Sequence, residues 1–121
     1  MLLSDIKNLL DAKVLTKESN DVLSQKDIHT ACGCDLMSDV LAFAKDQAVL
    51  ITGLVNPQVV RTALMMDMNC IVFVRSKQPS DDIIRLAKEH ELVVLSTDKS
   101  LYTSCGILYT NGLAGSKGAV K

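Results

Sequence analysis

The sequence predicts one α/β domain, a three-layer α/β/α sandwich whose mostly parallel sheet has about five strands. Three short apolar runs support this, because 22 residues separate Val49 from Ile71 and Ile71 from Val93. Each run is apolar at odd and even positions alike, as is typical of a strand covered on both faces. Helical patterns fill the intervals, and strands that alternate with helices must run parallel with right-handed crossovers.

The first half of the chain is less regular, and its elements rest on local signals. Ser4 is expected to cap a helix that ends at Leu10, followed by a short strand over residues 13–15. The polar segment 17–26 predicts a loop or a short turn of helix. Residues 28–31 predict a further strand.

The later helices have clearer beginnings. Asp35 or Ser38 is expected to cap the helix before the run at Val49. The inward side of that helix is predicted to consist of Leu36, Val40, Leu41 and Ala44. Asn56-Pro57 places an N-cap before a proline at the first helical position, and Ser80 precedes two acidic residues that suit a helix N-terminus. The last helix is expected to end at Asn111-Gly112, a left-handed C-cap.

Length and composition bound the class of protein. A chain of 121 residues has the size of one domain, and we expect that domain over residues 1–113 with a flexible C-terminal tail over 114–121. Thirteen basic against fourteen acidic residues give a net charge of −1, without the basic excess of a protein that binds nucleic acid through phosphates. Two Phe, two Tyr and no Trp are too few for a base-stacking platform.

No segment has the features of a targeting or membrane-spanning sequence. The first residues lack a basic region followed by an apolar run of signal-peptide length, and the longest apolar runs have about five residues, far fewer than a membrane span needs. We therefore expect a cytoplasmic protein without a membrane partner, with its four cysteines reduced.

The loops that follow the three apolar runs are the predicted ligand site. In parallel α/β sheets the loops at the carboxyl ends of the strands form the binding crevice, and each loop here leads to a helix N-terminus that attracts anions. An anionic small molecule such as a nucleotide is the expected ligand, and ordinary polar loops are the alternative. The candidate residues are Thr52, Gly53, Asn56, Arg75, Ser76, Lys77, Thr97 and Asp98.

Catalysis is not predicted. Neither a dinucleotide fingerprint nor a phosphate-binding P-loop is present, and no base is placed to activate a hydroxyl nucleophile. A transferase or hydrolase is therefore the least favoured class, and no cofactor is expected.

The motif Cys32-Gly33-Cys34 suggests an alternative function. Two thiols at this spacing can bind a soft metal or form a redox pair. A cluster that also uses Cys70 and Cys105 is doubtful, because Cys70 is expected at the opposite end of the sheet. Cysteines as small apolar core residues are the simpler interpretation.

The pattern resembles the DRTGG domain, which is similar to the N-terminal domain of HPr kinase. The resemblance covers about residues 3–113, and it depends on four segments: Ser4-Asp5-Ile6-Lys7, the stretch 32–44 that begins Cys-Gly-Cys-Asp-Leu-Met, Val49 to Gly53, and Ile83 to Thr97. The family usually has Asp-Arg after a Thr-Gly turn, and Thr-Gly-Gly at the end of the next strand. This chain keeps Thr52-Gly53, but it has Leu54-Val55 and Arg75-Ser76-Lys77 at the other positions.

The resemblance implies a regulatory or assembly module rather than a catalyst. Such domains are commonly dimeric, accompany nucleotide-sensing modules or metabolic enzymes, and in stand-alone form resemble small proteins encoded near iron-only hydrogenase genes. It therefore implies a homodimer, a possible protein partner and a link to hydrogenase or central metabolism.

The methionines at 65, 66 and 68 cannot all face inward, so they fit either core packing or a dimer interface.

Overall fold

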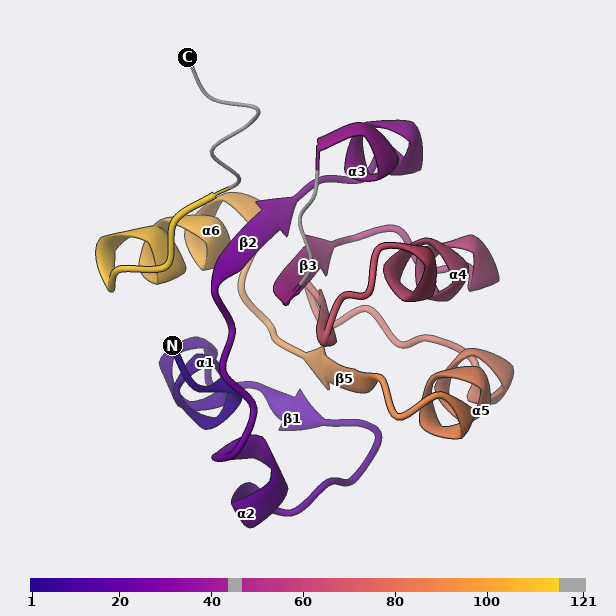
Figure 1. Cartoon of the computed structure of the whole chain (residues 1–121), viewed down its shortest axis with the longest axis horizontal. Helices are drawn as coiled ribbons and strands as arrows, with labels where there is room; N and C mark the ends of the chain where they lie inside the picture. The colour runs from indigo at the N-terminus through magenta and orange to yellow at the C-terminus, as the bar shows by residue number, and fades with distance from the viewer. Residues whose placement is uncertain (44–46, 116–121) are drawn as a thin grey trace.

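The computed structural model describes residues 1–43 and 47–115, and in this part of the chain the predicted fold class is confirmed (Figure 1). Helices and strands follow one another in this order: α1 Leu3–Leu10, β1 Lys13–Val14, α2 Asn20–Leu23, β2 Thr30–Gly33, α3 Met37–Phe43, β3 Ala48–Thr52, α4 Pro57–Met65, β4 Cys70–Phe73, α5 Asp81–Glu89, β5 Val93–Ser96 and α6 Leu101–Thr110.

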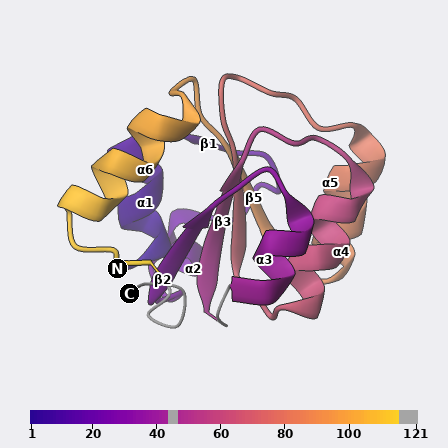
Figure 2. The same ribbon diagram turned by 90° about the horizontal axis from the view of Figure 1, so that it is seen from above.

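The five strands form one sheet in the order β1-β5-β4-β3-β2. Strands β2 to β5 are parallel neighbours, and β1 pairs antiparallel with β5. Helices α3, α4 and α5 connect the parallel strands and cover one face of the sheet, whereas α1 and α6 lie on the other face (Figure 2). Because all three crossovers turn the same way, the parallel strands are laid down side by side in chain order.

The sheet separates two apolar clusters. Val49, Val72 and Leu95 point toward the side of α1 and α6, whereas Leu50 and Phe73 point toward α3, α4 and α5. Every residue of β3, β4 and β5 is buried, as the unbroken apolar runs predicted.

The second half of the chain matches its sequence-based prediction closely. The expected strand over 93–96 is β5, and β3 and β4 each begin one residue earlier than expected. Asn111 follows α6 as its C-cap, and Gly112 has the positive φ of 104° expected of a left-handed terminator.

The first half differs more from the prediction. Leu2 rather than Ser4 precedes α1, and the carboxylate of Asp5 accepts the Leu2 N–H at 3.3 Å. The strand expected over 28–31 lies at Thr30–Gly33 instead. Of the side chains expected to face inward on this helix, Leu36 precedes α3 and is exposed, Leu41 is exposed, and Val40 is buried. Ala44 lies outside the described residues.

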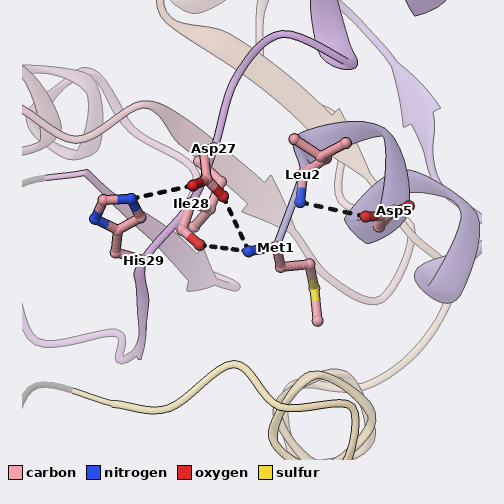
Figure 3. Close-up of polar contacts among 6 residues, drawn as sticks. All are labelled: Met1, Leu2, Asp5, Asp27, Ile28 and His29. Carbon is pink, nitrogen blue, oxygen red and sulfur yellow. Dashed lines mark hydrogen bonds and ion pairs between the residues drawn. The ribbon is translucent and has the colours of Figure 1, made fainter.

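A polar cluster anchors the start of the chain to the segment that leads into β2 (Figure 3). The Met1 amino group donates to the Asp27 carboxylate at 3.1 Å and to the Ile28 carbonyl at 3.0 Å, and His29 lies 3.2 Å from the same carboxylate. The hydrogen bond from the amino group is the main cause of the lowered pKa of Asp27. His29 is exposed and precedes β2, which fits a structural role.

Part of the expected C-terminal tail contacts the sheet. The Ala31 N–H on the outer edge of β2 donates to the Ala114 carbonyl at 3.0 Å. Residues 116–121 lie outside the described part of the chain.

Candidate functional site

The connections after β4 and β5 diverge at the carboxyl edge of the sheet. The chain after β4 leads to α5 on one face, and the chain after β5 leads to α6 on the other (Figure 2). Neighbouring strands whose exits diverge in this way open the crevice in which α/β proteins bind ligands. Five predicted site residues lie on these two exits: Arg75, Ser76, Lys77, Thr97 and Asp98.

Backbone hydrogen bonds join the two exit loops. The Arg75 N–H donates to the Lys99 carbonyl at 2.9 Å, and the Ser76 N–H donates to the Thr97 carbonyl at 2.9 Å. The Ser76 hydroxyl also donates to the Asp98 carboxylate. The amides of Arg75 and Ser76 are therefore used within the protein, and the exposed side chains of this loop are what it offers to a ligand.

The loop after β4 has an uncommon backbone. Arg75 and Ser76 have φ values of 57° and 58°, in the left-handed region that glycine and asparagine adopt most readily. A non-glycine residue in this region costs about 1–2 kcal/mol. This chain therefore holds an arginine and a serine in a backbone conformation that favours glycine.

A pocket of about 350 Å³ opens between the loop after β4 and the turn that joins α1 to β1. The Thr97 hydroxyl fixes one wall by donating to the Leu10 carbonyl at 2.7 Å. The pocket is lined by two carboxylates, one lysine and several neutral groups: Asp11, Ala12, Lys13, Ser76, Gln78, Ser96 and Asp98. Sequence reasoning missed Asp11 and Lys13, because they reach the site only through the antiparallel pairing of β1 with β5.

The remaining predicted residues lie one strand away, at the exit of β3. The Asp35 carboxylate accepts the Thr52 hydroxyl and the Gly53 N–H, both at 2.8 Å. Asp35 was expected as a helix cap, but α3 begins at Met37. Asp35 instead joins the segment before α3 to the end of β3 through these hydrogen bonds. Thr52 also accepts the Leu54 N–H at 3.1 Å, so this buried hydroxyl is fully engaged inside the protein.

The helix N-termini along this edge differ in how they are capped. Ser80 and Ser100 accept N–H groups of α5 and α6 through their hydroxyls. Asn56 precedes α4, but its side chain makes no capping hydrogen bond, and its buried oxygen has no partner among the residues that the structure describes. Asp81 and Asp82 make the start of α5 acidic, so this helix does not attract an anion.

The cysteine motif is placed differently from its prediction. Cys32 lies within β2 rather than after it. The pKa of the Cys32 thiol is raised to about 11, mainly by burial, with smaller contributions from the nearby Cys34 and Cys105 thiols and from Asp39. Burial also raises the pKa values of Cys70 and Cys105. A raised pKa leaves little thiolate, the form that binds metals and exchanges disulfides.

Across residues 1–43 and 47–115, no three His, Cys, Asp or Glu side chains gather closely enough to hold a metal ion. In the same residues, no helix has the length and apolar character needed to cross a membrane.

The strand order and the edge pocket define the class of protein: a small α/β domain with its candidate ligand crevice at the carboxyl edge of a parallel sheet. The model of the DRTGG domain family matches residues 5–110. The chain therefore belongs to the DRTGG domain family.

Among solved structures, the chain is similar to the CBS and DRTGG domains of the regulatory region of Clostridium perfringens pyrophosphatase, a structure determined in complex with the activator diadenosine tetraphosphate. The TM-score is 0.68 at 15% sequence identity, and the match covers 98% of this chain and 52% of the other. The chain thus spans about half the length of that regulatory region, and the likeness shows the fold. A comparison with curated protein sequences gives no significant match.

Proposed function

We propose that this chain is a cytoplasmic, non-catalytic regulatory domain that binds a small anionic metabolite, a nucleotide in particular, and acts as a homodimer. The observation that carries the proposal is the pocket beside the diverging exits of β4 and β5, where two neighbouring strands send their chains to opposite faces. The setting we propose, hydrogenase or central metabolism with a protein partner, comes from the family resemblance.

The charges around the pocket suit a ligand with two chemically different ends. Asp11 and Asp98 outnumber Lys13 in the lining, so a bare phosphate inside the pocket would meet a net negative charge. Carboxylates readily accept hydrogen bonds from the hydroxyls of a ribose. Arg75 and Lys77 are exposed on the adjoining loop and can bind phosphates outside the pocket.

The left-handed loop supports the same assignment. Residues held in unfavourable backbone conformations cluster at binding sites, and glycine would satisfy the backbone of residue 75 without supplying a charge. We therefore assign phosphate binding to the Arg75 side chain. The edge of the proposed site is shaped by Thr52, Gly53, Asn56 and Thr97. The buried hydroxyls of Thr52 and Thr97 and the Gly53 N–H form hydrogen bonds that hold the loops in place.

Calorimetric titration tests the proposal directly. The probes are AMP, ATP and diadenosine tetraphosphate, with inorganic phosphate and ribose as the two halves of the expected ligand. Binding of a nucleotide but of neither half at the same concentration supports the two-ended site. No heat and no thermal stabilisation with any nucleotide at millimolar concentration would contradict ligand binding.

Variants locate the site. Arg75→Gly removes the charge and relieves the backbone, so it should weaken nucleotide binding by about 10- to 100-fold while the protein remains folded. Arg75→Lys keeps the charge and serves as the matched control. Asp98→Asn should also weaken binding, through the pocket. Equal affinity in all three variants would place the ligand elsewhere.

A further inference from the structure

The outward side of α6 is unusual for a surface helix. Ser100 to Ser116 contains no charged residue, and α6 lies entirely within this stretch. Its inner side buries Ser104 and Leu108, as expected for a helix packed on a sheet. Its outer side nevertheless carries Tyr102 and Tyr109 at 90% and 71% exposure.

The exposed residues form a continuous strip. Tyr102, Gly106 and Tyr109 follow one another at spacings of four and three, which places them on one side of a helix. A shallow groove of about 610 Å³ runs over the same side of α6, between these tyrosines. The strip therefore has both projecting rings and a hollow that can receive a ring.

Gly106 needs an explanation that the single chain does not supply. Glycine within a helix is less favourable than alanine. A Cβ atom built at Gly106 would meet no atom within 4 Å, so nothing in the described protein requires a glycine there. Glycine in a helix permits the close approach of another backbone.

We infer that α6 is the centre of a self-association surface, on which a second copy of this chain packs by crossing its own α6 near Gly106. The inference specifies the homodimer of the proposed function and rests on it. A two-fold contact sets the same surface against itself, so projections and hollow must lie on one surface, as they do here. Residues close to the two-fold axis meet their own copies, so an uncharged strip at the crossing avoids like-charge repulsion.

Other occupants fit this strip less well. A membrane-bound amphipathic helix carries Lys or Arg beside its apolar side, and α6 has none. The competing dimer surface is α4, where Met65 is 73% exposed but Arg61 is exposed on the same helix. A helix of ten residues is about 15 Å long. A standard protein interface buries about 800 Å² of surface on each partner. On this scale α6 forms only the middle of the proposed interface.

The test is the mass of the protein in solution, measured by sedimentation equilibrium over a range of concentrations. Wild-type protein is expected at twice 13.1 kDa. Gly106→Glu and Gly106→Lys should each be monomeric, with dissociation constants raised by more than about a hundredfold, because each places like charges at the crossing point.

Controls separate folding, surface and function. Gly106→Glu places a good helix former in open space, so its circular dichroism melt should be no lower than that of the wild-type monomer. Met65→Glu, on the opposite layer, should remain dimeric. A dimer that persists in both Gly106 variants overturns the inference about α6 and leaves the homodimer standing.

A wild-type protein that is monomeric at every concentration overturns both the homodimer and the α6 surface. The nucleotide titration is measured independently, so the ligand site is judged on its own result.

Discussion

Helices α5 and α6 cover opposite faces of one sheet, and their outward sides are chemically opposite. Both bury apolar side chains against the strands, Ile83 and Ala87 from α5 and Leu108 from α6. Five of the nine residues of α5 are charged, whereas α6 has no charge and exposes two tyrosines. The inner sides of both helices are apolar because they pack on the sheet. Their outer sides differ because those sides depend on whether the helix faces solvent or a binding partner.

The largest expected effect tests whether the buried sides of α5 and α6 contribute equally to the free energy of unfolding. Leu108→Ala and Ile83→Ala each remove a buried side chain and should lower the free energy of unfolding by about 2–5 kcal/mol. Urea denaturation measures both. A loss below 1 kcal/mol in either variant would show that the helix concerned packs loosely on its face.

The raised pKa of the Cys32 thiol in β2 provides the next test. Because burial raises the pKa of Cys32 to about 11, its thiolate fraction at pH 8 is about a hundred times smaller than that of a thiol with a pKa of 9.0. Its alkylation by iodoacetamide, followed by mass spectrometry, should therefore still accelerate between pH 9 and pH 11. A plateau below pH 9 would contradict this and would favour the alternative redox function.

A glycine substitution on the α6 side should cost less than the core deletions. A Cβ atom at Gly33 would overlap the sulfur of Cys105 on α6, so Gly33→Ala should lower the free energy of unfolding by about 1–3 kcal/mol. Adding Cys105→Ala makes room for the methyl group. The double variant should therefore lose less stability than the sum of the two single variants.

The same substitution on the outer side of α6 should have the opposite sign. Gly106→Ala adds a methyl group that meets no atom of residues 1–43 and 47–115 within 4 Å and improves helix propensity, so it should stabilise the monomer by up to about 1 kcal/mol. The measurement is a urea melt at concentrations too low for association. Destabilisation would mean that the backbone at residue 106 requires glycine for its own conformation.

The smallest effect belongs to the charged side of α5. Arg85 donates to the Asp82 carboxylate at 3.0 Å, and both side chains are exposed. Arg85→Ala should cost no more than about 0.5 kcal/mol, since exposed ion pairs contribute little. The difference should vanish in 1 M salt, and a larger, salt-independent loss would indicate packing by the arginine stem.

The sequence predicted the parallel part of the fold well, because burial on both faces produces continuous apolar runs. β5 was located to the residue, and β3 and β4 to within one residue. The first half was harder for a physical reason. Its strands lie at the two edges of the sheet, where fewer side chains are buried, and β2 was consequently placed two residues early.

The candidate site was predicted in part. The exits of β4 and β5 were identified from the rule for parallel sheets, and the structure joins Ser76 to Asp98 there. Asp11 and Lys13 were missed because they come from an antiparallel edge strand, whose partner no local pattern reveals. The left-handed backbone of Arg75 was hidden as well, since the usual signal for it is a glycine.

The hydrogen bond from Ala31 to Ala114 has a consequence for handling the protein. An edge strand with unpaired N–H and carbonyl groups is a template on which strands of other molecules can add. Ala114 occupies one of these groups on β2, so the chain that follows α6 shields the rim of the sheet. Ending the protein before this residue would leave the Ala31 N–H on the edge strand unpaired and should favour aggregation, although all the helices and strands of the described residues would still be present.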